Sequence, residues 1–271
     1  MVLKLRDLGR TGEKLPVIGV GTWKLGSEPQ EEIESIRYAI SSGAGFVDTA
    51  EMYGTEALVG EAIKGSKVFV ATKVSPHNFH KEDVIKSCNA SLKRLGIKQI
   101  DLYQLHWPNK SVPIAETMAA MEQLVKDGKV RYIGVSNFDV KELEEAQAAL
   151  KSNDIVSNQI EYSILVRTPE NGLSNYMKEN HITLIAYSPL ARGAIFTKKY
   201  APVEALLSEI ATKHGISASQ VALAWLVSKP NVVAIPKASS YSHTKQNIES
   251  GSIELTEEDL KKIDSFLPNG L

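Results

Sequence analysis

The sequence has very little cysteine. Cys88 is the only one among 271 residues, so no disulfide can form within the chain and no site with several cysteine ligands can be built. This is typical of proteins in a reducing compartment. The chain also has no uncharged apolar run near the roughly 18 residues of a membrane span, and its charged start lacks the apolar stretch of a signal peptide. We therefore expect a cytoplasmic protein.

Net charge is almost absent as well. Lys and Arg number 31 against 32 Asp and Glu, which gives −1 and a pI near 6.6. A chain with interspersed charges and no basic excess is poorly suited to nucleic acid or to an anionic membrane. We therefore expect a small-molecule partner, no metal, and a monomer or a weak oligomer.

Short runs rich in β-branched residues alternate with amphipathic stretches along the whole chain. Most runs are almost continuously hydrophobic, as in parallel strands buried on both faces. Eight such units within about 250 residues predict an α/β fold, the (β/α)8 or TIM barrel, as one domain over residues 1–271. The runs cover residues 17–21, 45–49, 68–74, 100–106, 130–136, 155–162, 182–188 and 232–236.

Two segments fall outside a simple barrel repeat. Residues 1–14 are predicted to form a hairpin, with Gly12 in its turn, that covers the barrel floor. The stretch from residue 187 to 232 is too long for one helix and predicts an extra one. Ser217 with Gln220, and Thr256 with Asp259, are possible capping boxes that begin late helices. We therefore expect additional helices toward the C-terminus.

Three successive strand runs end in polar or charged side chains. These are Asp48, Lys73 and His106. Chemistry in such barrels lies at the C-terminal ends of the strands. Isolated charges in that position would be costly, whereas paired ones are tolerated. We therefore expect Asp48 and Lys73 to pair at the barrel mouth, near His106.

Tyr53 lies five residues after Asp48, close enough to fold back over the mouth. A phenol with an ordinary pKa of about 10 is a poor acid-base group at neutral pH. A neighbouring ammonium favours the phenolate, so Lys73 is expected to lower the pKa of Tyr53. His106 could orient a carbonyl oxygen or relay the proton.

Each of these residues also has an ordinary structural interpretation. Asp48 and Lys73 are as well explained by a salt bridge as by catalysis, Tyr53 alone is better explained as a loop aromatic, and His106 could be a hydrogen-bonded structural histidine. Their occurrence together, at three successive strand ends and the loop between two of them, favours a proton-handling site.

A set of motifs in fixed order resembles the aldo-keto reductase family from about residue 3 to residue 266. The second motif, Asp48-Thr49-Ala50-Glu51-Met52-Tyr53-Gly54, is very similar to the family segment that holds the catalytic Asp and Tyr. The others are V-I-G-V-G-T-W at 17–23, A-T-K at 71–73, D-L-Y-Q-L-H-W at 101–107, G-V-S-N-F at 134–138, N-Q at 158–159, A-Y-S-P-L at 186–190 and I-P-K at 235–237.

The resemblance implies an NADPH-dependent reductase of aldehydes, dicarbonyls or keto-sugars, with NADH also possible. It implies that Tyr53 is the general acid, that Lys73 lowers its pKa, that Asp48 pairs with Lys73 and that His106 orients the carbonyl. Trp23 and Trp107, with Tyr53 and His106, are expected to wall the substrate pocket. Few residues follow Phe266, so we expect that pocket to be open.

The resemblance also implies a cofactor held without a Rossmann unit, and Lys24 stands where a third glycine of that motif would be. Tyr187 is expected against the nicotinamide ring, with Ser136, Asn137 and Gln159 on its carboxamide. Ser188 and Leu190 are expected along the pyrophosphate, and Lys237 at the adenosine phosphate. The full expected set is Gly21, Thr22, Trp23, Asp48, Ser136, Asn137, Gln159, Tyr187, Ser188, Leu190, Lys237, Ala238, Ser239, Ser240, His243 and Asn247.

Two other classes of protein remain open. One is a nicotinamide-binding regulatory subunit with little turnover, against which the complete Asp48, Tyr53, Lys73 and His106 set argues. The other is a barrel hydrolase or isomerase built around a metal or phosphate. That class predicts further ligands at later strand ends, where Ser136, Gln159, Tyr187 and Pro236 stand instead.

One departure from the family pattern concerns the choice of cofactor. His243 stands where many relatives have an arginine that grips the adenosine 2′-phosphate, and Ala238 stands where they have a serine. Arg offers a permanent bidentate fork that neutral His lacks. We predict that His243→Arg raises the ratio of kcat/KM with NADPH to kcat/KM with NADH, measured by initial rates. An unchanged ratio would contradict this role for position 243.

Overall fold

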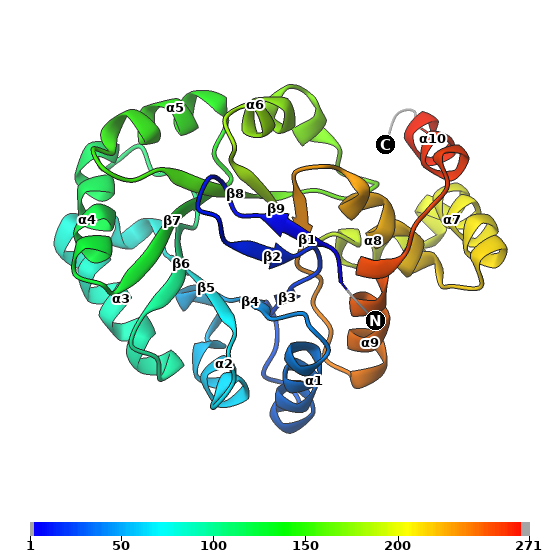
Figure 1. Cartoon of the computed structure of the whole chain (residues 1–271), viewed down its shortest axis with the longest axis horizontal. Helices are drawn as coiled ribbons and strands as arrows, with labels where there is room; N and C mark the ends of the chain where they lie inside the picture. Colours follow the sequence, from blue (N-terminus) through cyan, green and yellow to red (C-terminus); the bar gives the residue numbers. More distant parts are fainter. Residues whose placement is uncertain (1–2, 267–271) are drawn as a thin grey trace.

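Eight parallel strands form the centre of the protein in a computed structural model that describes residues 3–266. Their order in the sheet follows the chain from β3 to β10. Helices in the connections carry the chain back, so that all eight strands run in the same direction (Figure 1). The strands are β3 (Val20–Gly21), β4 (Phe46–Asp48), β5 (Phe69–Val74), β6 (Ile100–Leu105), β7 (Val130–Ser136), β8 (Ile155–Glu161), β9 (Thr183–Tyr187) and β10 (Val232–Ala234).

The two end strands of this sheet meet and close it. Ile18 forms a parallel bridge with Ala234. The amide of Gly19 donates to the carbonyl of Ala234 at 2.8 Å, and the amide of Ala234 donates to the carbonyl of Val17 at 2.9 Å. Closure leaves no free edge in the eight-stranded sheet within residues 3–266. The prediction of a (β/α)8 barrel is confirmed, and the short β3 lies within the first expected run.

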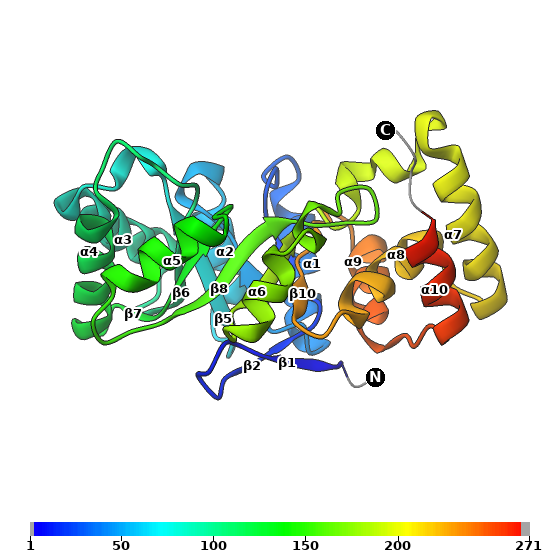
Figure 2. The ribbon, with the colours of Figure 1, turned by 90° about the horizontal axis from the view of Figure 1, so that it is seen from above.

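Helices surround the barrel, and the expected extra ones are present. Two helices, α7 and α8, connect β9 to β10, and α10 follows α9 at the side of the molecule (Figures 1 and 2). Both expected capping boxes form, at Ser217 with Gln220 and at Thr256 with Asp259. The helices are α1 (Pro29–Ser41), α2 (Glu56–Ile63), α3 (Lys81–Leu95), α4 (Ile114–Lys126), α5 (Val140–Ala149), α6 (Leu173–Glu179), α7 (Ala201–His214), α8 (Ala218–Ser228), α9 (Tyr241–Glu249) and α10 (Glu257–Ser265).

The N-terminal hairpin covers the floor of the barrel, as the sequence predicted. Strands β1 (Leu5–Asp7) and β2 (Lys14–Pro16) pair antiparallel, and the hairpin crosses the barrel end in Figure 1 and lies below it in Figure 2. Gly12 has φ +76° in the turn, which suits a residue without Cβ. Leu8 and Leu15 are buried in the cluster that fills the barrel interior. The hairpin therefore leaves the opposite end of the barrel for a site.

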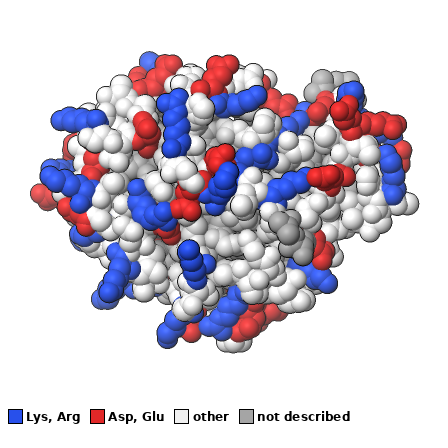
Figure 3. All heavy atoms as spheres, in the orientation of Figure 1, with Lys and Arg blue, Asp and Glu red and all other residues white. Residues whose placement is uncertain are grey.

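Charges of both signs are interspersed over the face that carries the hairpin (Figure 3).

None of the helices within residues 3–266 combines the length and the apolar character needed to cross a bilayer. The residues after Phe266, on which the expectation of an open pocket depended, lie outside the described part of the chain.

Gly19 allows the first strand segment to approach β4 closely. A Cβ at this position would lie 2.5 Å from Cδ1 and 2.9 Å from the carbonyl oxygen of Phe46. We therefore predict that Gly19→Ala lowers the free energy of unfolding by about 1–3 kcal/mol, the usual cost of overpacking a core, measured by urea denaturation. Gly45→Ala is the matched control, because a Cβ there meets nothing within 4 Å. Equal stabilities of the two variants would contradict the close approach.

Candidate active site

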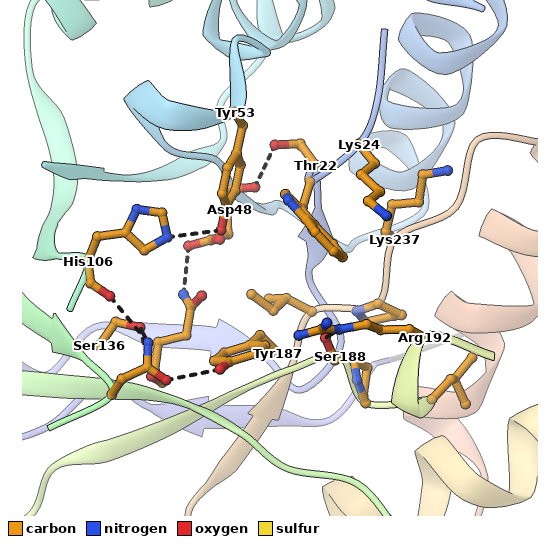
Figure 4. A pocket seen from close by; sticks show the side chains of 18 of the residues that line it. Thr22, Lys24, Asp48, Tyr53, His106, Ser136, Tyr187, Ser188, Arg192 and Lys237 are labelled. Carbon is orange, nitrogen blue, oxygen red and sulfur yellow. Dashed lines mark hydrogen bonds between the residues drawn. The ribbon is translucent and has the colours of Figure 1, made fainter. Parts of the chain in front are cut away.

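A cavity of about 590 Å³ lies at the C-terminal ends of the strands. This size is in the range of small-molecule and cofactor sites. Side chains from most strands and from the loops that follow them point into the cavity (Figure 4). The expected residues that line it are Gly21, Thr22, Trp23, Asp48, Tyr53, His106, Trp107, Ser136, Asn137, Gln159, Tyr187, Ser188, Leu190 and Lys237.

Lys73 and Asp48 form an ion pair beneath the cavity. Lys73 Nζ lies 2.5 Å from Asp48 Oδ1, and neither side chain is more than 2% exposed. Lys73 Nζ also donates to the carbonyl of Thr49 at 2.8 Å. Lys73 lies one residue before the end of β5, and Asp48 is the last residue of β4. The structure therefore brings these two predicted residues together.

The other oxygen of Asp48 accepts two amide groups. Gln159 Nε2 donates to Asp48 Oδ2 at 2.8 Å, and Gln104 Nε2 donates to the same oxygen at 3.1 Å. All three side chains are buried. Together with Lys73 at Oδ1, these two donors give both oxygens of the buried carboxylate a hydrogen-bond partner.

Lys73 also holds the hydroxyl of Tyr53. Lys73 Nζ donates to Tyr53 Oη at 3.3 Å. Burial raises the pKa of Tyr53 above its ordinary value; the charge of Lys73 lowers it and that of Asp48 raises it. Lys73 therefore lowers the pKa of Tyr53, as expected from the sequence, but burial has the larger effect and the pKa lies above its ordinary value. Tyr53 is therefore a protonated phenol at neutral pH.

Lys73 remains charged despite its burial. Burial alone would lower the pKa of Lys73, but the charge of Asp48 and the hydrogen bonds to Asp48 and Tyr53 outweigh burial, so the pKa of Lys73 lies above its ordinary value. The site thus contains a permanent ammonium in contact with a neutral phenol.

The short helix that carries Tyr53, η1 (Glu51–Tyr53), is anchored to the loop after β5. Glu51 Oε1 accepts from the backbone amide of Ser75 at 2.6 Å and from Asn78 Nδ2 at 3.0 Å. These bonds fix η1 beside the strand that carries Lys73. This role of Glu51 was not predicted, because an acidic residue in a loop has no distinctive sequence pattern.

His106 faces Tyr53 from the end of β6. His106 Nε2 lies 3.4 Å from Tyr53 Oη, and the two rings meet edge to face (Figure 4). Burial, followed by the charge of Lys73, lowers the pKa of His106 to about 3. The imidazole is therefore neutral at physiological pH. A neutral imidazole can donate a hydrogen bond to a carbonyl oxygen, but it is too weak an acid to protonate the substrate.

A chain of polar groups forms the wall after β7. Ser136 Oγ donates to the carbonyl of Gln159 at 2.9 Å. Asn137 Nδ2 donates to the carbonyl of His106 at 3.2 Å, and Tyr187 Oη donates to Asn137 Oδ1 at 3.0 Å. Asn137 adopts a φ of +63°, a conformation that asparagine tolerates better than most residues. Asn137, expected to hold the nicotinamide carboxamide, and Tyr187, expected against the nicotinamide ring, are thus in contact.

The loop after β9 turns through several left-handed residues next to the cavity. Ser188, Ala191, Arg192 and Gly193 have φ values of +48°, +48°, +55° and +84°. Such turns direct backbone amides to one side and favour anions. Ser188, Leu190, Arg192 and Gly193 line the cavity, so the backbone here suits a phosphate group.

Two cations lie close to the ring of Trp23 at the mouth of the cavity. Lys24 Nζ is 4.5 Å from the centre of its ring, and Arg192 Cζ is 5.1 Å from it. Both cations line the cavity, as does Lys237. Positive charge therefore gathers around a mouth in which the Asp48 charge is already balanced by Lys73.

The remaining expected cofactor residues do not line this cavity. They lie beyond Lys237 in the connection to α9 and in α9 itself: Ala238, Ser239, Ser240, His243 and Asn247. Lys237 Nζ donates to Ser239 Oγ at 3.1 Å, and Ser240 caps α9 through the amide of His243. Their role at an adenosine phosphate stays a prediction.

Several lining residues were not expected from the sequence. They are Lys24, Met52, Pro189, Arg192, Gly193, Phe196, Ile235 and Pro236. Gln104, which is buried against Asp48 beneath the cavity, was also missed, although it lies two residues before His106 and so faces the same side of the strand. Phe196 and Arg192 come from an irregular helical turn, η4 (Ala191–Phe196), which has no periodic signal.

Comparison with known proteins agrees with this fold. A model of the Aldo/keto reductase family matches residues 17–268. The chain therefore belongs to the aldo/keto reductase family. The resemblance found in the sequence, and with it the prediction of an aldo-keto reductase, is confirmed.

Individual relatives match over nearly their whole length. The chain is 39% identical to methylglyoxal reductase YeaE of Escherichia coli (strain K12), and the match covers 94% of this chain and 92% of that protein. It is 36% identical to glyoxal reductase of Bacillus subtilis (strain 168), covering 94% and 90%. Similarity is therefore not confined to the barrel motifs.

Solved structures are similar in fold as well. The thermostable aldo-keto reductase Tm1743, in complex with the inhibitor epalrestat, has a TM-score of 0.91 and 42% identity, covering 97% of this chain and 99% of that one. An aldo-keto reductase from Klebsiella pneumoniae in complex with NADPH has a TM-score of 0.91 and 34% identity, covering 97% and 95%.

The burial of the ion pair leads to a prediction about stability. In Lys73→Met the carboxylate of Asp48 loses its cation while it stays out of water, so we expect a loss of about 3–5 kcal/mol in the free energy of unfolding, measured by urea denaturation. Lys261→Met is the control, because its partner Glu257 and Lys261 itself are 91% and 81% exposed. That exposed pair should contribute less than about 1 kcal/mol. Similar losses in both variants would contradict a buried, coupled pair.

Proposed function

We propose that this chain reduces the carbonyl group of small molecules with NADPH and that Tyr53 donates the proton. One observation carries the proposal: the neutral hydroxyl of Tyr53 reaches the cavity while a buried ammonium lies 3.3 Å behind it and a neutral imidazole 3.4 Å beside it. A phenol in this position can give up its proton because Lys73 stabilises the phenolate that remains.

The lining of the cavity fits a nicotinamide dinucleotide. Asn137 and Gln159 provide amides for a carboxamide, and the ring of Tyr187 lies at the same wall. The left-handed turn at 188–193 and the side chains of Lys24, Arg192 and Lys237 provide amides and positive charge for phosphates. When bound, the cofactor supplies the hydride.

The protein residues handle the oxygen of the substrate. His106 donates a hydrogen bond to a carbonyl oxygen through Nε2 when its ring is the Nε2–H tautomer, and Tyr53 Oη lies next to the same point. As negative charge develops on that oxygen, Tyr53 transfers its proton. Asp48 keeps Lys73 charged throughout, so the phenolate is balanced at once.

Two relatives support small dicarbonyl compounds as substrates. They are named for methylglyoxal and glyoxal. The mouth also exposes Trp23, Met52, Trp107 and Phe196, which gives an apolar rim that accepts aldehydes with a larger body. We therefore propose dicarbonyls and aldehydes as the substrate class, with keto-sugars as further candidates.

Loss of the absorbance of reduced cofactor tests this function. Purified protein is mixed with NADPH or NADH and a panel of glyoxal, methylglyoxal, aromatic aldehydes and keto-sugars. The proposal expects oxidation of NADPH with at least the dicarbonyls. Binding of the cofactor without oxidation across the whole panel would instead support a regulatory subunit.

The role of Tyr53 leads to a prediction. Tyr53→Phe keeps the ring and its packing but removes the proton donor, so we expect kcat to fall by at least about a hundredfold, the usual scale of general acid catalysis. The dissociation constant of NADPH, measured by protein fluorescence, should stay close to the wild-type value. A near-normal kcat in Tyr53→Phe would show that another group protonates the substrate.

A further inference from the structure

A buried glutamine connects the proton-handling pair to the wall where we place the cofactor. Gln104, in β6, has no exposed surface. On the basis of the proposed function, we infer that Gln104 is a positioning residue: its amide holds Asp48 and at the same time orients Gln159. Neither its neighbours in sequence nor the motif around His106 indicates this role.

The strand register places Gln104 under the site. Gln104 pairs with Lys73 of β5 on one side and with Gly134 of β7 on the other. A Cβ on Gly134 would lie 3.0 Å from Cγ of Gln104 and 2.6 Å from Oγ of Ser157. Gly134 therefore leaves the space in which the side chain of Gln104 extends toward Asp48.

The chemistry of the partners fixes the direction of both amides. A carboxylate only accepts hydrogen bonds, so Gln104 and Gln159 must each turn their NH2 group toward Asp48 Oδ2. Gln159 Nε2 also lies 3.4 Å from Gln104 Oε1. The two protons of Gln159 Nε2 thus have separate acceptors, one on Asp48 and one on Gln104. This leaves Oε1 of Gln159 as the atom that turns toward an incoming amide, such as that of nicotinamide.

Removal of the Gln104 amide has two consequences. Asp48 Oδ2 loses one of its two donors, so the carboxylate that pairs with Lys73 is held less firmly in place. Gln159 loses the acceptor that orients it. The charged and titratable groups that face Asp48 are Lys73 on β5, Tyr53 on η1 and His106 at the end of β6, so the effect will reach the proton donor.

Two variants separate these roles from simple packing. Gln104→Met keeps the length and bulk of the side chain but has no donor. We expect kcat to fall about tenfold, which is the lower end of the effect of losing a hydrogen bond to a charged group. The KM of the carbonyl substrate should change little. We also expect the dissociation constant of NADPH, measured by fluorescence, to rise a few-fold.

Gln104→Glu tests the positioning role through the pH dependence of kcat, which a purely structural role would not change. A second carboxylate beside Asp48 is repelled when both are ionised, so activity should fall more than in Gln104→Met near neutral pH. When protonated, the new carboxyl can donate to Asp48 and accept from Gln159. The ratio of its kcat to that of the wild type should therefore increase as the pH is lowered.

Ser157→Ala is the matched control in the same layer. Ser157 Oγ is buried next to Gly134 and has no hydrogen-bond partner within the described chain, so its removal should leave kcat and NADPH binding at wild-type values. Wild-type kcat and NADPH affinity in Gln104→Met, or a flat ratio across pH for Gln104→Glu, would overturn the inference. If the wild type turns over no carbonyl, the proposed function fails, and the NADPH dissociation constant of Gln104→Met alone decides the role of Gln104.

Discussion

A lysine ammonium shielded from water needs a counter-charge at contact distance, and the barrel provides it on the neighbouring strand. Asp48 Oδ1 lies 2.5 Å from Lys73 Nζ, and parallel pairing of β4 with β5 fixes that approach. The other oxygen of Asp48 is held by Gln159 and Gln104. A charge pair with all its partners in place is stable in the interior, whereas half of it would not be. Four strands, β4, β5, β6 and β8, therefore supply the side chains that make up this buried charge pair and its partners.

The two groups that would contact a substrate are both neutral at physiological pH, and burial moves the pKa of each further from that pH. It raises the pKa of Tyr53 and lowers that of His106 to about 3. Lys73 acts on both, stabilising the phenolate of Tyr53 and disfavouring an imidazolium. A permanent cation next to a neutral acid and a neutral hydrogen-bond donor suits a reaction that places negative charge on oxygen.

Much of this was predictable because the relevant signals are local. Buried parallel strands read as apolar runs, so a polar residue at their end, such as Asp48 or His106, is conspicuous. Gln104 was missed although it shares a strand face with His106, because an uncharged amide attracts less notice than a charge. Arg192 was not predictable, since it reaches the cavity through left-handed turns. The net pKa of Tyr53 depends on burial, which no spacing of residues gives.

Lys73 is proposed to stabilise the phenolate that forms when Tyr53 gives up its proton, and a double-mutant cycle on kcat tests this coupling most directly. Turnover with NADPH and methylglyoxal is compared in the wild type, Lys73→Met, Tyr53→Phe and the double variant. Residues that act as one unit are strongly non-additive. We expect the double variant to be about as slow as Tyr53→Phe alone. Losses that multiply would contradict it, because Lys73 would then contribute independently of the tyrosine.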